Sequence, residues 1–144
     1  RRVPDRAARL DGVWSAMTDD AWDADALTRA GPMAAWRLLG VRWREVEIHW
    51  VDLDVGYGPG DWPAAFAAPL LPALVEPARL GPRLPADLTV DIEATDSGQH
   101  WSVGTGPAHA VVRAPTWALV GWLIGRPAAA RAELGQPPAL APWS

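Results

Sequence analysis

A polar pair inside a helical apolar pattern is the feature that most constrains how this chain of 144 residues can fold. Apolar residues recur at helical spacing from about Met33 to about Val55, so we expect one long α-helix there. Glu45 and His49 are four residues apart in it, which places their side chains within about 40° of each other, one turn apart. Arg42 and Asp52 fall on the same stripe.

The face on which this stripe lies matters more than the spacing. The apolar side chains on the side of Glu45 are Leu38, Leu39, Val41, Val46, Ile48 and Leu53, whereas Arg44, Glu47 and Asp54 lie opposite. We therefore expect Glu45 and His49 to face a core. Burying a charge without a partner costs several kcal/mol, so an inward-facing polar stripe must be paired or must bind a metal.

Two explanations of the stripe remain open on spacing alone. Arg42, Glu45, His49 and Asp52 can form a buried salt-bridge network that performs no chemistry. Alternatively, Glu45 and His49 can provide two ligands of a divalent metal, because side chains at positions i and i+4 of a helix converge. A carboxylate oxygen and an imidazole nitrogen both suit zinc.

Two motifs resemble those of a known family. Residues 44–63, REVEIHWVDLDVGYGPGDWP, resemble the signature of the mycothiol-dependent maleylpyruvate isomerases, which belong to the DinB-like thiol-dependent metalloenzymes. Residues 121–126, GWLIGR, resemble the Trp-Leu-x-Gly-Arg element in the C-terminal domain of the same family. The two motifs occur in the order that the family has, and together they cover the middle and the end of the chain.

The resemblance implies a role for each candidate site residue. Glu45 and His49 would be ligands of zinc or of another divalent metal, and mycothiol would be the thiol cofactor. Apart from the resemblance, Arg42 and Asp52 on the same stripe are expected to contact these ligands, Asp52 by orienting His49. Arg126 would be a catalytic residue that pairs with a substrate carboxylate, a task suited to its bidentate guanidinium. Without the resemblance, a structural role at the end of a helix would be preferred for Arg126.

The implied activity is the cis–trans isomerisation of maleylpyruvate, a small carboxylate substrate, to fumarylpyruvate. An external thiol, activated as a thiolate at zinc, would add to the double bond and leave after rotation about the resulting single bond. Two rival classes remain: a related thiol-dependent metallotransferase with another electrophile, and an inactive or non-enzymatic bundle remnant. Family members have two further N-terminal helices, one of which carries a third histidine ligand, so we expect an N-terminally truncated member with these helices upstream.

We expect an α+β fold in two domains. Residues 1–80 would form the C-terminal half of a DinB-like helical bundle that carries the metal ligands, and residues 81–144 a small α/β domain with a short antiparallel sheet. The Pro- and Gly-rich segment 77–85 marks the boundary. The period of the apolar pattern changes from 3.6 to 2 beyond it.

The expected elements follow from these periods and from turn residues. Strands are predicted at 88–93, 99–103 and 108–113, and helices at 5–17, after Asp61, and from Pro115 to Gly125. Pro69 and Pro72 should kink or split the helix that follows Asp61. The segment 21–30 is ambiguous.

Composition narrows the classes of function. A net charge of −4 argues against a nucleic-acid partner, which requires concentrated positive charge. The chain has no cysteine, so any thiol chemistry needs a thiol from outside. The longest apolar run, residues 117–124, is too short for a membrane span, which takes about 20 residues. We therefore expect a cytoplasmic protein that contacts neither nucleic acid nor membrane.

Three further features are predicted to be structural. Gly104-x-Gly106 lacks the strand–Gly-x-Gly-x-x-Gly–helix context of a phosphate loop, so we expect a turn there. His100 and His109 lie in predicted strands, where a paired histidine is a better explanation than a metal ligand.

Overall fold

The computed structural model of the chain describes residues 3–29 and 31–142. Packing divides the chain into two compact units, Arg1–Val46 and Glu47–Ser144. The division falls inside the helix that carries Glu45 and His49. The two domains expected at residues 1–80 and 81–144 stay a prediction, because a grouping by packing does not test their boundary.

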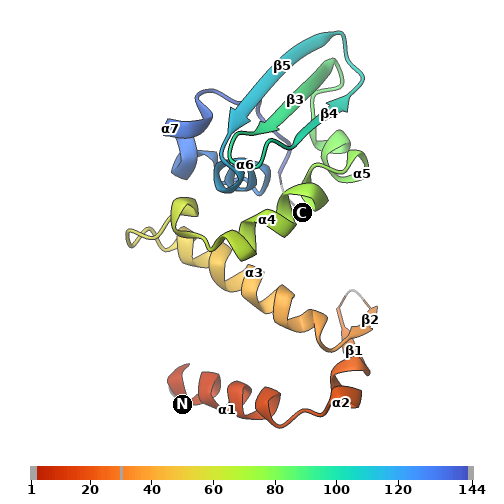
Figure 1. The fold of residues 1–144 in the computed structure, drawn as a ribbon, viewed down its shortest axis with the longest axis vertical. Helices are drawn as coiled ribbons and strands as arrows, with labels where there is room; N and C mark the ends of the chain where they lie inside the picture. Colours follow the sequence, from red (N-terminus) through yellow and green to blue (C-terminus); the bar gives the residue numbers. More distant parts are fainter. Residues whose placement is uncertain (1–2, 30, 143–144) are drawn as a thin grey trace. The chain divides into compact units, whose positions relative to one another are not determined.

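The first unit combines short helices with a β-hairpin and the start of a longer helix (Figure 1). Its elements are α1 (Val3–Ser15), α2 (Asp19–Asp23), β1 (Asp25–Thr28), β2 (Gly31–Ala34) and α3 (Arg37–Asp52), which continues into the second unit. Thr18 caps α2, since its Oγ1 accepts a hydrogen bond of 3.4 Å from the backbone N–H of Ala21. Strands β1 and β2 pair antiparallel, with Asp25 opposite Ala34.

The long helix is shorter than the sequence predicts. α3 ends at Asp52, and Met33 lies not in the helix but in β2, opposite Ala26. Gly31 has a φ of +110°, a conformation that glycine adopts without strain and that opens the second strand of the hairpin. Backbone pairing with β1 therefore overrides the helical spacing of the side chains at residues 33 and 34.

Helix α3 has two apolar faces, and only one of them is buried. Ile48 and Val51 are 7% and 9% exposed, and Glu47 beside them is 8% exposed. The apolar residues of the other face, which are 38–47% exposed, are Leu39, Trp43, Val46 and Trp50, and Leu53 just beyond the end of the helix is 67% exposed. Glu45 and His49 lie between the two faces and are exposed, so the expectation that they face a core is wrong for the described chain.

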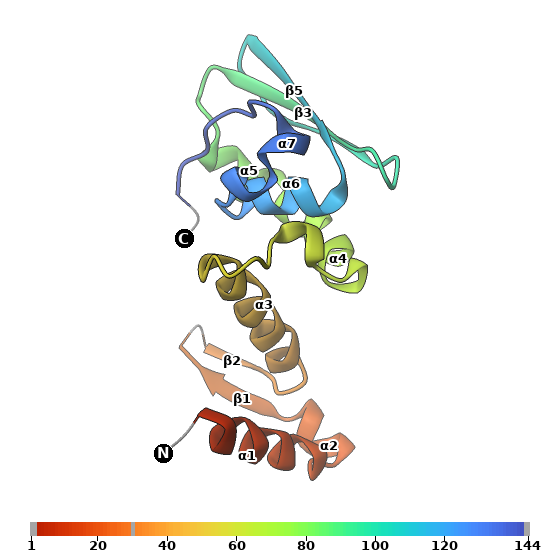
Figure 2. The ribbon, with the colours of Figure 1, turned by 90° about the vertical axis from the view of Figure 1, so that its left-hand side faces the viewer.

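The second unit places helices beside a small sheet, as Figure 2 shows. After α3 come the 3₁₀-helix η1 (Pro59–Asp61), α4 (Ala64–Leu74), α5 (Pro77–Leu80), η2 (Gly81–Arg83), β3 (Leu88–Ala94), β4 (His100–Gly104), β5 (Ala108–Ala114), α6 (Thr116–Leu123), η3 (Pro127–Ala130) and α7 (Arg131–Leu134). Among the described helices, none is long and apolar enough to cross a membrane.

Helix α4 follows a short 3₁₀-helix and is continuous. Asp61 belongs to η1, where its carboxylate accepts a hydrogen bond of 2.8 Å from the N–H of Gly58, and α4 begins only after Pro63. The helix then passes Pro69 and Pro72 without a split. Its apolar side chains hold it in place, since Phe66, Ala67, Leu71 and Leu74 are all buried.

Helix α6 is the centre of the core of this unit. Four of its residues have no exposed surface: Ala118, Leu119, Val120 and Leu123. They belong to one apolar cluster with Leu71 of α4 and with Val90 and Ile92 of β3. The alternation predicted for β3 is present, because Val90, Ile92 and Ala94 are buried and the residues between them are not.

The sheet is mixed rather than antiparallel, because its third strand runs parallel to its first. The strand order is β4-β3-β5, with β3 antiparallel to β4 and parallel to β5. Two strands joined by a short loop must run in opposite directions, and β4 and β5 do so with β3 between them. The sequence pattern predicts each strand but not this order, because alternation carries no information about neighbours.

The loop between β4 and β5 must cross the start of β3, and glycines make this possible. Gly104 has a φ of +103°. A Cβ on Gly106 would lie 1.8 Å from the carbonyl carbon of Asp87, so only glycine fits there. Thr89 fixes the crossing, since its Oγ1 donates a hydrogen bond of 2.8 Å to the carbonyl oxygen of Gly106. The Gly104-x-Gly106 segment is therefore a tight crossing turn.

Replacing Gly106 tests this account of the sheet. We predict that Gly106→Ala lowers the free energy of unfolding by about 1–3 kcal/mol, because the added methyl group forces the loop away from β3. Gly81→Ala is the matched control, since a Cβ there meets nothing within 4 Å and the backbone is helical. Chemical denaturation measures both variants. Equal stability of the two would contradict the crossing described above.

Candidate functional site

Helix α3 carries three of the predicted site residues on one side. At about 100° per residue, Asp52, Glu45 and His49 project within an arc of roughly 60°, between the buried and the exposed apolar faces. Glu45 lies in the first compact unit, and His49 and Asp52 lie in the second. Arg42 is also on α3, and its side chain makes no hydrogen bond or ion pair within the part of the chain that the structure describes.

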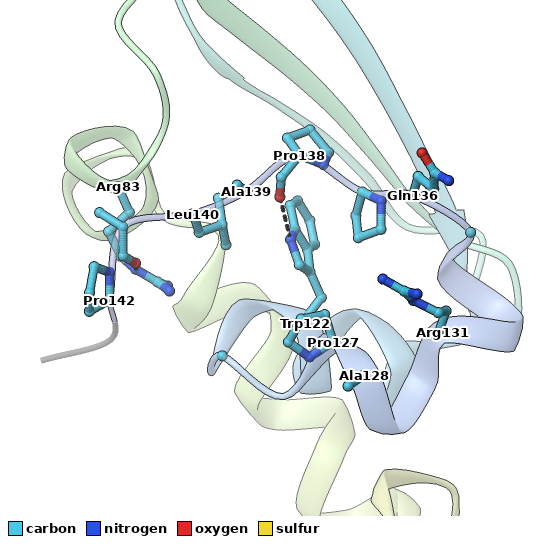
Figure 3. Close-up of a pocket in the computed structure, with 14 residues that line it drawn as sticks. Arg83, Trp122, Pro127, Ala128, Arg131, Gln136, Pro138, Ala139, Leu140 and Pro142 are labelled. Atoms are coloured by element: carbon cyan, nitrogen blue, oxygen red, sulfur yellow. Dashed lines mark hydrogen bonds between the residues drawn. The ribbon is translucent and has the colours of Figure 1, made fainter.

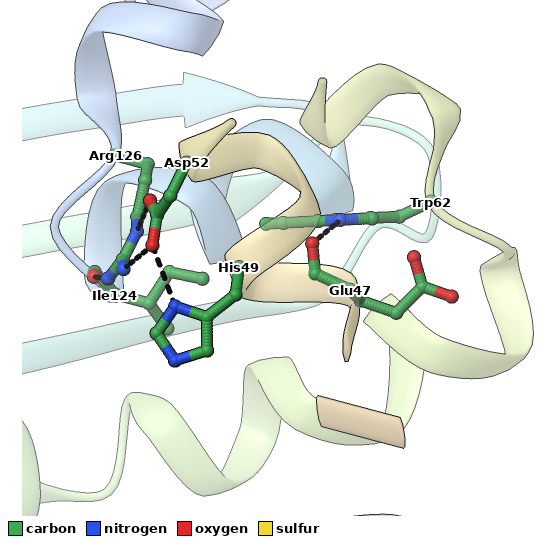
Figure 4. Close-up of polar contacts among 6 residues, drawn as sticks. All are labelled: Glu47, His49, Asp52, Trp62, Ile124 and Arg126. Atoms are coloured by element: carbon green, nitrogen blue, oxygen red, sulfur yellow. Dashed lines mark hydrogen bonds and ion pairs between the residues drawn. The ribbon is translucent and has the colours of Figure 1, made fainter. Parts of the chain in front are cut away.

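Asp52 joins His49 to Arg126 (Figure 4). Its Oδ2 lies 2.9 Å from Nδ1 of His49 and accepts a hydrogen bond of 2.7 Å from Nη2 of Arg126. Its Oδ1 accepts a second bond of 3.0 Å from Nε of Arg126, so that the guanidinium binds the carboxylate with two donors. One carboxylate thus holds two predicted site residues that are separated by 77 positions in the sequence.

The end of α6 sets the position of Arg126. Gly125 has a φ of +85°, and the backbone N–H of Arg126 donates to the carbonyl of Gly121 at 2.7 Å, as in a Schellman motif. Nη1 of Arg126 donates to the carbonyl oxygen of Ile124 at 2.7 Å. Arg126 therefore bonds to a carbonyl at the end of α6, which is the structural role considered for it. It contacts Asp52 as well.

The start of α6 is fixed as firmly as its end. The carboxylate of Asp96 accepts hydrogen bonds from the backbone N–H of Thr116 at 3.0 Å and from its Oγ1 at 2.7 Å. Burial alone would raise the pKa of Asp96, but these hydrogen bonds outweigh burial and lower it. A helix held at both ends presents Arg126 from a rigid support.

Arg126 also stabilises the ionised form of Asp52. Its hydrogen bonds lower the pKa of Asp52 against the opposing effect of burial, and His49 adds to the lowering. Asp52 is therefore ionised at neutral pH, and an ionised carboxylate can only accept hydrogen bonds. It follows that Nδ1 of His49 carries the proton that it shares with Asp52.

A buried carboxylate on the opposite side of α3 was not predicted. The hydroxyl of Tyr57 donates a hydrogen bond of 2.5 Å to Oε2 of Glu47. The Tyr57 ring stacks on the Trp50 ring, with 4.6 Å between the ring centroids. The indole N–H of Trp62 donates to the backbone carbonyl of Glu47 at 3.3 Å (Figure 4). Glu47 was expected on the polar side of the helix, but Ile48 and Val51 beside it form a second apolar face, which is the sequence signal for its burial.

A cavity of about 660 Å³ lies elsewhere in the second unit, between α6, η3, α7 and the segment 136–142 (Figure 3). The indole N–H of Trp122 crosses it to donate to the carbonyl of Pro138 at 3.0 Å. Arg83 lies at one end and Arg131 at the other. None of the predicted site residues lines this cavity, so it is separate from the His49–Asp52–Arg126 cluster.

The chemistry of the donors on α3 fits a divalent metal in part. A carboxylate on one turn and an imidazole on the next are suitable ligands, and a histidine that binds a metal usually donates its other N–H to a carboxylate, as His49 does to Asp52. Within residues 3–29 and 31–142, no group of three or more His, Asp or Glu side chains is placed to hold a metal. The assignment of Glu45 and His49 as metal ligands therefore stays a prediction.

This chain matches known proteins by structure and not by sequence. No family model and no curated protein matches the sequence. The chain is similar to the crystal structures of a mycothiol-dependent maleylpyruvate isomerase and of a variant in which a histidine is replaced by alanine, each with a TM-score of 0.75 and 26% sequence identity. Each match covers 95% of this chain and 57% of the solved chain, so the chain spans less than two thirds of these structures.

This likeness confirms two expectations from the sequence. The resemblance inferred from the two motifs holds at the level of the structure, and the α+β, DinB-like fold class agrees with that of the solved enzymes. The structures that the chain resembles are those of an isomerase that depends on mycothiol.

Titration of Tyr57, the only tyrosine in the chain, tests the buried pair on α3. Burial and the hydrogen bond to Glu47 raise the pKa of Tyr57 to about 12. The folded state therefore favours the protonated phenol, and this stabilisation is complete below about pH 10 and is lost as the pH rises towards 12. Phenolate absorbance at about pH 10.5 should be small in the folded protein and large in urea. Glu47→Gln should increase the phenolate absorbance of the folded protein. If Tyr57 of the folded wild type titrates like a tyrosine in the unfolded chain, the pairing with Glu47 is contradicted.

Proposed function

We propose that this chain is part of a zinc- and mycothiol-dependent cis–trans isomerase of the maleylpyruvate isomerase type. The observation that carries the proposal is the structural similarity over 95% of the chain to such an enzyme. The cluster of His49, Asp52 and Arg126 supports it, because both family motifs meet there. A small thiol and a small carboxylate would be the partners, and the cytoplasm the location.

In this proposal Glu45 and His49 hold the metal, and a third protein ligand comes from outside the described residues. Zinc held there would lower the pKa of an external thiol and so favour the thiolate at neutral pH. Because the chain has no cysteine, the attacking sulfur must belong to the cofactor. A thiol activated in this way would supply a nucleophile for reversible addition to the cis double bond of the substrate, and through it the isomerisation to the trans form.

Arg126 is the candidate for binding a substrate carboxylate. Of its five N–H groups, three are used by Asp52 and Ile124, which leaves one on Nη1 and one on Nη2. Asp52 and Ile124 fix the guanidinium, so a substrate carboxylate would meet donors that are already oriented. Arg42 would support the α3 ligands from its neighbouring position on the helix.

The main alternative is a related thiol-dependent metallotransferase. It would use the same metal and the same external thiol but would transfer the thiol to another electrophile, without the final elimination. An inactive remnant is the other alternative. Product analysis separates the three: an isomerase forms the trans product without consuming the thiol, a transferase consumes the thiol, and an inactive remnant forms no product.

A zinc measurement tests the metal ligands. We predict about one zinc per chain in the purified full-length protein, and a loss of zinc in His49→Ala with little change in fold, because the His49 side chain is 65% exposed. His109→Ala is the control, since His109 is similarly exposed on β5 and its Nδ1 lies 3.6 Å from Asp91. Elemental analysis after dialysis gives the content. Equal zinc in wild type and His49→Ala would rule out the assignment.

Turnover of maleylpyruvate with mycothiol tests the role of Arg126. Arg126→Lys keeps the charge but loses the planar fork, so kcat/KM should fall about tenfold or more, which corresponds to about 1.5–3 kcal/mol for a charge-assisted hydrogen bond. Arg131→Lys, at an exposed arginine outside the cluster, should leave kcat/KM unchanged. Equal kcat/KM in Arg126→Lys and wild type would show that Arg126 does not bind the substrate.

A further inference from the structure

Arg126 reaches two separate parts of the second unit with one side chain. Its Nη1 bonds to the carbonyl of Ile124, two residues away, whereas Nε and Nη2 bond to Asp52, 74 residues away. A guanidinium that only served the end of α6 would need the first contact and not the second. The second contact therefore calls for an explanation of its own.

The contact with Asp52 leads directly to His49. Oδ2 of Asp52 receives Nη2 of Arg126 at 2.7 Å and faces Nδ1 of His49 at 2.9 Å. Since Arg126 also binds Oδ1, the carboxylate cannot rotate away from His49 without breaking a two-donor contact. The plane and direction of the Asp52 carboxylate, and with them the orientation of the imidazole, are set by Arg126.

We propose that Arg126 is a positioning residue that acts through Asp52 to hold the His49 imidazole with its proton on Nδ1, which makes Nε2 the nitrogen that binds the metal. This inference rests on the proposed function for the identity of the ligand, and it adds that Arg126 controls metal affinity without touching the metal. The contact of Arg126 with Asp52 also links the end of α6 to α3, so that residues of both family motifs orient His49.

The exposure of the three residues agrees with a positioning role better than with a role in folding. The side chains of Arg126 and Asp52 are 24% and 37% exposed, and ion pairs as accessible as this one contribute little to stability. Their geometry is nevertheless tight, with two bonds between the same pair of side chains. A contact that is precise but contributes little to stability is what the orientation of a ligand requires.

The test compares Asp52→Asn, Arg126→Gln and the double variant in the full-length protein. Arg113→Gln is the matched control, because Arg113 forms an exposed ion pair of 2.9 Å with Glu93 away from the cluster. Two quantities are measured: zinc affinity by competition with a chelator, and the protonated ring nitrogen of His49 by NMR of the imidazole nitrogens in the metal-free protein. His100 and His109 serve as internal references in the spectra.

We expect both single variants to bind zinc about tenfold or more weakly and to lose the preference for Nδ1–H at His49, while Arg113→Gln changes neither. The double variant should bind zinc no more weakly than Asp52→Asn, because Arg126 acts through Asp52. Unchanged affinity and an unchanged His49 tautomer in Arg126→Gln would overturn the inference, as would a wild type with the proton on Nε2.

Failure of the proposed function gives a different pattern. If the wild-type protein binds no zinc, the metal assignment fails, and the NMR measurement alone decides on the positioning role. A His49 tautomer that changes in Arg126→Gln then supports that role, and one that does not change overturns it.

Discussion

The two-donor contact between Arg126 and Asp52 is the interaction on which the candidate site depends. It joins the last turn of α3 to Arg126, just beyond the C-terminal end of α6, and it gives one carboxylate a fixed direction. His49 takes its own orientation from that carboxylate. The two sequence motifs also pack against each other where Pro59 approaches Gly121, and the Arg126–Asp52 contact adds a polar link between them.

The support for this contact comes from the core of the second unit. Asp96 fixes the first turn of α6, the Schellman motif at Gly125 fixes its last turn, and the residues between them are buried against α4 and β3. Ile48 and Val51 belong to the same cluster, so α3 is held by its buried face while Glu45 and His49 stay accessible. A ligand-bearing helix must combine a packed side with an open one, and α3 has both.

Much of this could be predicted from the sequence, and the failures have physical reasons. The strands at residues 88–94, 100–104 and 108–114 follow from alternation and turn residues, and the helix from Pro115 to Gly125 from its apolar run and its terminal glycine. The parallel pairing of β5 with β3 could not be predicted, because it depends on a loop that crosses β3 at Gly106. Met33 was misassigned because hairpin pairing overrode its helical spacing.

The faces of α3 show the limit of periodicity most clearly. The helix has apolar side chains on two sides, so a helical wheel cannot tell which side is buried in this chain, and Glu47 was placed in solvent although Tyr57 pairs with it in the core. The spacing of Glu45 and His49 could be read from the sequence, and so could the resemblance that assigns them a metal. The contact of Asp52 with Arg126 could not be read, because it joins residues 74 positions apart.

The most direct test of the central claim is a crystal structure of the zinc-loaded protein with anomalous scattering recorded at the zinc edge. The account predicts one anomalous peak at about 2.0–2.1 Å from Nε2 of His49 and at about 2.0–2.2 Å from a carboxylate oxygen of Glu45, with Asp52 still bonded to Nδ1 and to Arg126. A peak at His100 or His109 instead, or zinc bound through Nδ1 of His49 with Asp52 displaced, would contradict it.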